Sequence, residues 1–469
     1  MTMSVNTLVW GFTRQWVKVI ETLKDNNVIV PKCWVSRLWH NQDKLLEEKN
    51  ILKESVFYSL KWTQKYKEEV VKYTNSVEFN QEVYDKVYAK LYLFIDHYSR
   101  HDFKYNRKSI HYYINQFNLL YHFFYGVFIK EQIQLVLIDC VPHLGVELII
   151  YEIAKALNIE TIIVIQSLTP NKFYYLNNID DYGDFQFMVK REAVPEIKLE
   201  KKFFIDHFYM RDLKQYRFSF LHVIKETIKR PHEFFEHFAC NYLRYRRAKQ
   251  YKKNLSQIVS PVDYGKKYVY FPLHLQPEMT TSALGGVFCD QVLALELLSK
   301  KIPEDWVIHV KENPKQTEFM RDDAFFARLK LMDNVRVTPL HENTFQLIEH
   351  SQFVASITGT AGWEAICGGK PALVFGKAWY QNFEGVFKWR DDIDINEIAN
   401  YQIDHAKLES DYNQLVSKMA TGVVDASYLC LVENYDEDKN IQEIAKFLSE
   451  LINEKDEKAT LSGPTQKMT

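Results

Sequence analysis

Small and polar residues follow the apolar run Phe353–Thr358 and lead directly into a helix-like pattern. A helix that begins at such a turn directs backbone N–H groups and the positive end of its dipole at one point, an arrangement that binds phosphate. Gly359 and Gly362 allow the backbone to approach a ligand closely, and the hydroxyl groups of Thr358 and Thr360 can donate to phosphate oxygens. A purely structural turn is the alternative. We therefore predict a phosphate-binding turn made of Thr358, Gly359, Thr360, Ala361 and Gly362.

Glu364 lies one helical turn further along. Its carboxylate can accept hydrogen bonds from a ribose or cap the helix, and both roles stay open. The segment lacks the Gly-Lys-Ser/Thr ending of a Walker A loop and the spacing of a dinucleotide fingerprint. It therefore predicts a nucleotide or phosphate ligand without defining the base.

A second polar group follows the apolar run Tyr268–His274. His274, Gln276 and Glu278 alternate around a proline, so extended backbone would direct all three side chains the same way. A histidine and a carboxylate on one face can act as an acid–base pair or hold the hydroxyl groups of a sugar. Although a lone histidine at a strand end is often structural, the neighbouring Gln, Glu and double glycine favour a functional role.

Charged residues follow a third run, Trp306–Lys311. Lys311 and Glu312 can bind anionic ligand groups or form a surface ion pair, and the charge pattern does not separate these alternatives. In the first half, Asp139, His143 and Glu147 lie at a strand-to-helix junction. Glu147 is a candidate base there, with a solvated helix residue as the alternative.

Alternating strands and helices are needed to bring these groups together. Short β-rich runs alternate with helical patterns, at 268–274, 306–311, 335–338, 353–358 and 372–376 in the second half and at 7–11, 28–35, 135–139 and 161–166 in the first. This alternation predicts parallel sheets, whose ligands bind beyond the carboxyl ends of the strands. Residues 53–130 are mainly helical and aromatic, and we expect these aromatic side chains to form a core.

Composition narrows the classes of function. The chain has 469 residues, a length that suggests two or three domains. Its formal net charge is −2, so no excess of basic residues is left to bind nucleic acid. None of the six cysteines forms a CxxC pair, which argues against structural zinc and a disulfide framework. No metal-binding motif occurs. The apolar runs are too short to cross a bilayer, and we expect a cytoplasmic protein.

Three segments together resemble a known family. The chain is similar to the bacterial capsular polysaccharide biosynthesis proteins, relatives of Kdo transferases, in YVYFPLHLQPEMTTSALGGVFCDQ, VIHVKENP and SITGTAGWEAICGGKPALVFGKAWYQNFEGVF. The resemblance is strong over about 268–390 and weaker over 133–170. It implies an α/β, GT-B-like glycosyltransferase with two Rossmann-like domains facing a cleft, helical additions in the N-terminal half, and no metal or other cofactor.

The resemblance also implies a division of the chain and of its site. We expect an N-terminal acceptor-side domain, a C-terminal nucleotide-sugar-binding domain, C-terminal helices and a disordered tail, at 1–255, 256–395, 396–452 and 453–469. Catalytic roles fall to His274, Glu278 and Glu147. The donor-binding set is Gln276, Lys311, Glu312, Asn313, Thr358, Gly359, Thr360, Ala361, Gly362 and Glu364, and the acceptor-side residues are Asp139 and His143.

One position departs from the family pattern. Relatives read Lys-Glu-His-Pro where this chain has Lys311-Glu312-Asn313-Pro314. Asn313 can donate a hydrogen bond but cannot carry a proton or a charge. If that histidine assists departure of the leaving group in relatives, the choice of donor or the rate differs here.

The expected function is transfer of a sugar from a nucleotide-sugar, with CMP-Kdo or a similar ulosonic acid as best candidate, to a cell-surface glycan or glycolipid. The alternatives are a GT-B-shaped epimerase or hydrolase and a non-catalytic assembly or export factor. A basic segment can contact anionic lipid at the inner face of the cytoplasmic membrane, and it contains Arg244, Arg246, Arg247, Lys249, Lys252 and Lys253. A solvated helix is the simpler interpretation of that segment.

Overall fold

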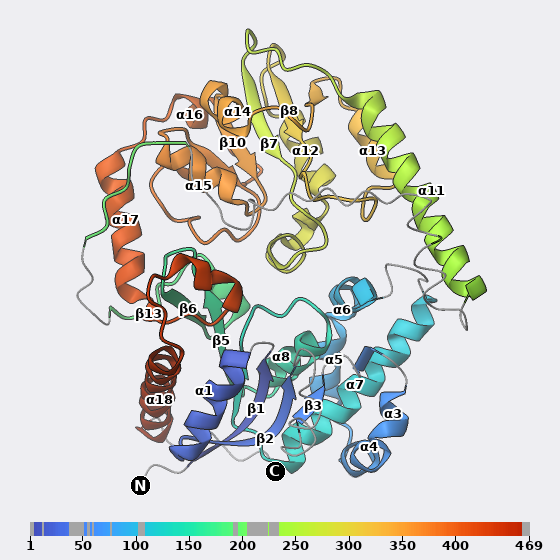
Figure 1. Cartoon of the computed structure of the whole chain (residues 1–469), viewed down its shortest axis with the longest axis vertical. Helices are drawn as coiled ribbons and strands as arrows, with labels where there is room; N and C mark the ends of the chain where they lie inside the picture. Colours follow the sequence, from blue (N-terminus) through green and yellow to red (C-terminus); the bar gives the residue numbers. More distant parts are fainter. Residues whose placement is uncertain are drawn as a thin grey trace.

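The protein folds around two β-sheets, which lie in the lower and upper halves of Figure 1. The computed structural model describes residues 4–11, 14–36, 51–53, 57–58, 61–75, 77–101, 108–190, 196–203, 224 and 234–461. Each sheet carries helices on its faces, and each has its own group of polar residues at the ends of its strands.

The first sheet has seven strands in the order β13-β6-β5-β4-β1-β2-β3. Its five parallel strands are β1 (Val5–Gly11), β2 (Ile29–Ser36), β3 (Ile51–Lys53), β4 (Leu135–Ile138) and β5 (Glu160–Gln166). Strands β6 (Lys172–Leu176) and β13 (Ala420–Thr421) extend it with antiparallel pairing. All of β4 is buried, as is typical of a strand covered on both faces.

Helices surround this sheet and fill the N-terminal half, as predicted. Helices α1 (Arg14–Asp25), α7 (Ile110–Lys130) and α8 (Val146–Ala156) accompany the short helices α3 (Trp62–Lys65), α4 (Lys67–Thr74), α5 (Gln81–Tyr88), α6 (Leu91–Tyr98) and η2 (Ser99–His101). Phe117, Tyr121, Phe124 and Phe128 of α7 are buried in the hydrophobic core. The prediction that these aromatic residues form a core is confirmed.

The second sheet has six parallel strands in the order β12-β11-β10-β7-β8-β9. The five predicted strands are all present, as β7 (Tyr268–Pro272), β8 (Val307–Lys311), β9 (Val335–Val337), β10 (Phe353–Ser356) and β11 (Ala372–Val374). The sequence analysis missed β12 (Val386–Lys388). Helices α12 (Gln291–Ser299), α13 (Asp323–Lys330), α14 (Thr344–His350), α15 (Thr360–Cys367) and α16 (Ile395–Asn400) complete this half.

Strand order locates a ligand-binding edge in each sheet. In the second sheet the chain leaves β7 for β8 on one side, and β10 pairs on the other side. In the first sheet, β1 likewise lies between β2 and β4. Such a switch point leaves a crevice beyond the carboxyl ends of the two neighbouring strands. The predicted residues 274–278 and 358–362 follow β7 and β10, and Asp139 follows β4.

The C-terminal part of the chain returns to the first sheet. After α17 (His405–Lys418), β13 pairs with β6, and α18 (Glu437–Leu461) lies beside α1, where Lys18 and Glu437 form an ion pair at 3.1 Å. Helix α18 therefore continues into the segment from 453 that was expected to be disordered, and residues 462–469 lie outside the described part. None of the described helices has the length and apolarity needed to cross a bilayer.

The two halves touch through a segment of the first domain that follows β6. Asp180 forms an ion pair with Lys377, and the carbonyl oxygen of Gly183 accepts a hydrogen bond from Nδ2 of Asn382 at 3.1 Å. Gly183 has a φ of +83°, and a Cβ at this position would lie 2.3 Å from the carbonyl oxygen of Ala378. Glycine is therefore required for the two halves to approach this closely.

Candidate functional site

The turn between β10 and α15 is built as a helix start without a side-chain cap. Its N-cap residue is Gly359, which offers no side chain to the first N–H groups. In this fully described half, α12, α13, α14, α16 and α17 all begin at an Asp or Asn that accepts such N–H groups. An anion is the ligand that best complements an uncapped helix N-terminus.

Side chains of the second domain hold this turn in place through hydrogen bonds. Oγ of Ser356 accepts the N–H of Gly359 at 3.0 Å and lies 2.9 Å from Nε2 of His274. The hydroxyl of Tyr380 donates to the carbonyl oxygen of Gly359. A Cβ at Gly359 would lie 2.8 Å from Nε2 of His274, and one at Gly362 would lie 2.3 Å from the Tyr380 hydroxyl. The two glycines therefore make room for His274 and Tyr380, and their role as points of ligand approach stays a prediction.

Thr358 also differs from expectation. Its hydroxyl donates to the carbonyl oxygen of Thr280 at 2.8 Å, so it is engaged with the protein and ties the turn to the segment after β7. Thr360 and Ala361 form the first residues of α15. Glu364 is buried on the same helix, and its charge acts on the hydroxyl of Tyr270. The roles predicted for these three residues stay predictions.

His274 and Gln276 point into the domain, and only Glu278 is exposed. Nε2 of Gln276 donates to the carbonyl oxygen of Cys289 at 2.6 Å, and its Oε1 accepts from Gln291 at 2.7 Å. Burial, assisted by the charge of Arg321, lowers the pKa of His274 to about 4. The expectation that the three side chains share one face is wrong, because these hydrogen bonds hold the first two inside.

Arg321 explains why Glu312, another residue predicted to bind the donor, is also buried inside the second domain. Its guanidinium forms a buried ion pair with Glu312 at 2.8 Å and donates to Oε1 of Gln276 at 2.6 Å. Lys311 donates from Nζ to the carbonyl oxygen of Glu342 at 2.6 Å. The two side chains bind other protein groups and form no surface ion pair with each other, and their contact with anionic donor groups stays a prediction.

Asn313 closes a turn directly after this pair. Its Oδ1 accepts the N–H of Lys315 at 2.9 Å, and its carbonyl oxygen accepts the N–H of Gln316 at 2.9 Å. The side chain thus stabilises the loop that follows β8. The turn conformation thus gives a reason for Asn at position 313, because Asn side chains readily accept hydrogen bonds from the backbone two residues on.

Glu147 is the central group on the side of the first domain. It is fully buried, and its Oε1 accepts the N–H groups of His143 at 2.8 Å and of Leu144. Its Oε2 has no hydrogen-bond partner among the described residues. Burial raises the pKa of Glu147 to about 7 against the lowering effect of these hydrogen bonds. The solvated-residue alternative is therefore excluded, and the carboxyl group is poised to exchange a proton near neutral pH.

His143 and Asp139 lie next to this carboxylate in the chain. Nδ1 of His143 lies 2.7 Å from the carbonyl oxygen of Val141, so Nδ1 carries the proton and Nε2 keeps its lone pair. Burial lowers the pKa of His143 to about 4, which keeps the ring neutral at pH 7. Asp139 follows β4, and its N–H donates to the carbonyl oxygen of Trp10 in β1 at 3.3 Å.

Arg100 connects the two domains electrostatically. Its Nη1 donates to the carbonyl oxygen of His143 at 2.8 Å, and its charge acts on both Glu147 and Glu278. Glu278 belongs to the second domain, and although it is exposed to solvent, the surrounding protein desolvates its carboxyl group and raises its pKa, whereas the charges of Arg100 and Lys315 oppose that rise. The two carboxyl groups predicted to be catalytic belong to opposite domains, and both interact electrostatically with Arg100. We call Asp96, His97, Arg100, His143, Glu147 and Glu278 the interdomain site.

Sequence reasoning missed the contribution of α6 and η2 to this site. Asp96 forms an ion pair with Arg100 at 3.5 Å. His97 is fully buried, and burial holds its pKa far below the usual range. The backbone of Ser282 in the second domain also acts on this ring, which agrees with the position of α6 beneath the upper domain in Figure 1. The only signal in the sequence is the spacing of four residues between Asp96 and Arg100.

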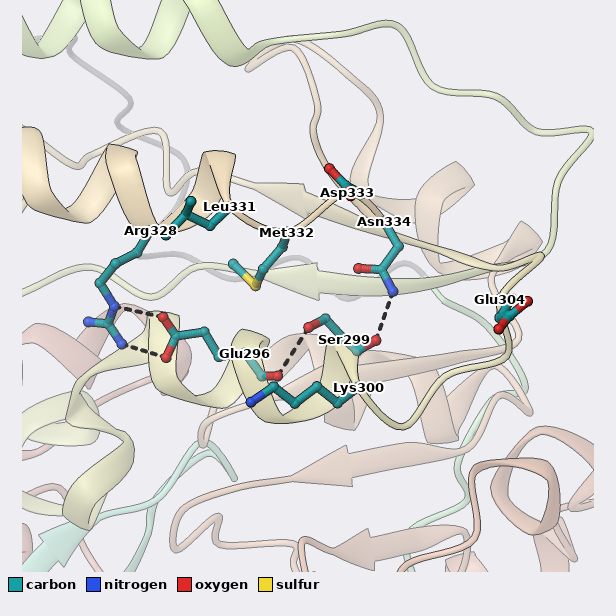
Figure 2. A pocket seen from close by; sticks show the side chains of 9 residues that line it. All are labelled: Glu296, Ser299, Lys300, Glu304, Arg328, Leu331, Met332, Asp333 and Asn334. Carbon is teal, nitrogen blue, oxygen red and sulfur yellow. Dashed lines mark hydrogen bonds and ion pairs between the residues drawn. The ribbon is translucent and has the colours of Figure 1, made fainter.

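A hollow elsewhere on the second domain is unrelated to these groups. Figure 2 shows it between α12 and α13, with Arg328 and Glu296 paired at 2.8 Å on its wall. None of the predicted site residues lines it. Within the residues that the structure describes, no group of three or more His, Cys, Asp and Glu side chains is arranged to hold a metal ion.

The fold and the site together define a class of protein. Two α/β domains with Rossmann-like parallel sheets, a C-terminal return to the first domain and polar residues at both switch points make a GT-B-like protein. The family model described as "Capsule polysaccharide biosynthesis protein" matches residues 186–419. The chain belongs to this family of capsule polysaccharide biosynthesis proteins.

Other comparisons add less. No curated protein matches the chain. Among solved structures, the beta Kdo 2,7 transferase of KpsC from Thermosulfurimonas dismutans is 10% identical, with 95% of this chain and 99% of that chain covered and a TM-score of 0.32. A UDP-GlcNAc 2-epimerase from Methanocaldococcus jannaschii is 11% identical, with 88% and 99% covered and a TM-score of 0.25. Likenesses at these scores carry no argument about this chain, and the family assignment rests on the family model.

Proposed function

We propose that the protein is a glycosyltransferase that moves a sugar from a nucleotide-sugar to a cell-surface glycan or glycolipid acceptor during capsule synthesis. One observation carries the proposal. Glu147 and Glu278 belong to different domains, both have a raised pKa, and both interact with Arg100. Two carboxyl groups on opposite sides of a shared site can supply a base for the acceptor hydroxyl and a negative charge beside the cationic sugar, the roles that paired carboxyl groups play in glycoside hydrolysis.

The donor nucleotide binds in the second domain, with its phosphate at the N-terminus of α15. Backbone N–H groups at Thr360 and Ala361 stabilise the charge that grows on the phosphate as the glycosidic bond breaks. Glu364 accepts hydrogen bonds from the ribose. Neutral His274 contacts the hydroxyl of Ser356, which in turn accepts the N–H of Gly359, and His274 thereby helps to position this turn. CMP-Kdo or a similar ulosonic acid is the donor that we favour, and no metal takes part.

The proton of the acceptor hydroxyl moves to Glu147. A carboxyl group with a pKa of about 7 is both sufficiently ionised and sufficiently basic to accept this proton at neutral pH. Glu278 stabilises positive charge on the sugar as its bond to the nucleotide lengthens. Asp139 and His143 belong to the acceptor side, where His143 offers the lone pair of Nε2 to an acceptor hydroxyl.

A thermal-shift panel with CMP, UDP, GDP and ADP tests the donor site. A ligand at about 100 times its dissociation constant stabilises a protein by about 2.7 kcal/mol, and the variant Thr360→Trp should abolish the shift by filling the turn. A shift with CMP alone supports a ulosonic acid donor, whereas UDP or GDP indicates a hexose. No shift with any nucleotide contradicts the proposal, and sugar release without an acceptor indicates a hydrolase.

We further propose that the protein works at the inner face of the cytoplasmic membrane and that α11 (Phe234–Ile258) contacts anionic lipid. Arg244 is not part of this surface, because it binds Glu318 at 2.9 Å. The five remaining basic residues are exposed, and none pairs with a carboxylate in the described part of the chain; they are Arg246, Arg247, Lys249, Lys252 and Lys253. Several cations near a membrane surface attract anionic lipid additively.

Vesicle sedimentation tests this contact. The protein should bind vesicles that contain phosphatidylglycerol and not vesicles of phosphatidylcholine alone. Changing Arg246, Arg247 and Lys249 to Ser should abolish binding, and changing the exposed Lys439 and Lys446 of α18 should not. Equal loss in both variants would indicate a general charge effect and contradict a specific role of α11.

A further inference from the structure

The face of α6 that is directed at the second domain adds polar and aromatic groups to the two proposed catalytic carboxyl groups. Tyr92, Asp96 and Arg100 are spaced four residues apart, which places them on one side of the helical segment α6–η2. The Tyr92 side chain is 79% exposed. Partial desolvation raises the pKa of its hydroxyl, and Cys289 and Asp290 of the second domain add to this rise, so an open aromatic ring lies at the edge of the interdomain site.

Buried polar atoms without partners lie deeper along the same face. Nε of Arg100 and Oε2 of Glu147 are buried and have no hydrogen-bond partner among the described residues, and the buried ring of His97 beside them interacts with the backbone of Ser282. Arg100 acts electrostatically on both His97 and Glu147, so these atoms belong to one cluster. Native proteins rarely leave buried polar groups unpaired. Two such atoms in one place indicate a ligand that both donates and accepts hydrogen bonds.

The charges around this cluster argue against an anionic ligand. Arg100 and Lys315 are the cations that act on these groups, and they are opposed by Asp96, Glu147 and Glu278. Burial keeps His97 and His143 neutral at pH 7. Asp290 already pairs with Arg328 at 2.7 Å. Among the described residues, no positive charge is left over here to attract a carboxylate or phosphate, whereas uncharged hydroxyl groups match the donor on Arg100 and the acceptor on Glu147.

We propose that this face of α6 is the acceptor subsite and that it binds a neutral sugar unit, which stacks on Tyr92 and hydrogen-bonds to Arg100 and Glu147. The inference rests on the proposed function, because it names the class of acceptor for the same site. Aromatic side chains together with a few convergent polar groups are the usual composition of such a pocket. A hydroxyl bound to Oε2 of Glu147 is placed to lose its proton.

Saturation-transfer NMR with simple glycosides tests the subsite without knowledge of the natural acceptor. The probes are the methyl glycosides of glucose, galactose, mannose and N-acetylglucosamine, and methyl glucuronoside is the charged match of methyl glucoside. We expect a signal from at least one neutral glycoside and loss of this signal in Tyr92→Ala and in Arg100→Gln. Tyr88→Ala is the control, because Tyr88 is an exposed tyrosine on α5 that stacks on Tyr84.

The outcomes separate the inference from the proposed function. No signal from any neutral glycoside, a stronger signal from the glucuronoside, or a signal that survives Tyr92→Ala would overturn the subsite. Because Tyr92 is exposed, this variant should fold even if Arg100→Gln does not. CMP binding, measured in the same samples, should be unchanged in Tyr92→Ala. Glycoside binding without any nucleotide binding would leave the subsite standing and contradict the glycosyltransferase proposal.

Discussion

The pH dependence of turnover should follow the ionisation of Glu147 and should change when Arg100 is removed. With a pKa of about 7, the carboxyl group is about half ionised at pH 7 and about a tenth ionised at pH 6. The rate should therefore rise about fivefold between these values if Glu147 is the base. Arg100 favours the charged form of Glu147, so Arg100→Gln should raise the pKa, and each unit of rise lowers the ionised fraction at pH 6 about tenfold.

The assay is kcat/KM for sugar transfer, measured from about pH 5 to about pH 9 to cover both sides of the ionisation. The acid limb should move to higher pH in Arg100→Gln and disappear in Glu147→Gln. Lys315→Gln is the matched control, because Lys315 acts on Glu278 and is not among the charges that shift Glu147. An acid limb near pH 4.5, or a limb that stays in place in Arg100→Gln, would refute the assignment of Glu147 as the base.

Three other substitutions probe the carboxylates and their support. Glu278→Gln should lower turnover at least about a hundredfold and leave nucleotide binding nearly unchanged, as measured by steady-state kinetics and thermal shift; unchanged turnover would remove Glu278 from the chemistry. Because the pKa of Glu147 is raised in the folded state, the free energy of unfolding of the wild type should fall by about 3 kcal/mol as the pH rises from about 4.5 through 7. Urea unfolding should therefore show a smaller loss in Glu147→Gln, and identical pH profiles would contradict the buried, protonated carboxyl. Arg321→Met should destabilise the fold by about 3–5 kcal/mol because it leaves the buried charge of Glu312 unpaired, whereas a loss below about 1 kcal/mol, typical of an exposed pair, would show that Glu312 is not isolated from water.

The periodic parts of the chain were predictable because short apolar runs and helical patterns are local signals. These signals located β7, β10 and α15, and they placed the turn at 358–362 at the edge of the sheet. They also led to Glu147 and Glu278, both of which interact electrostatically with Arg100 in the structure. The sequence contains no local sign of this convergence, since the three residues are far apart along the chain.

The errors have a common physical cause. The direction of the Gln276 and Glu312 side chains depends on Arg321, which binds both from a loop beyond β8 and also donates to the carbonyl oxygen of His274. Alternation along a strand does not predict such a partner. The contribution of α6 to the site was missed for a different reason, because its Phe94 and Tyr98 belong to an aromatic core and conceal the polar face that carries Asp96 and Arg100.

The pairing of β6 with β13 has a consequence for the order in which the nascent chain can fold. Strand β6 is complete after residue 176, but its partner at 420–421 is synthesised only after the whole second domain. The second sheet is contiguous in the sequence and can form earlier. Until β13 and α18 emerge from the ribosome, β6 presents an open edge, and Phe173 and Tyr175 lack the cover of Phe447. Open edges with apolar side chains promote aggregation, so chains truncated before residue 420 should be recognised by chaperones during synthesis.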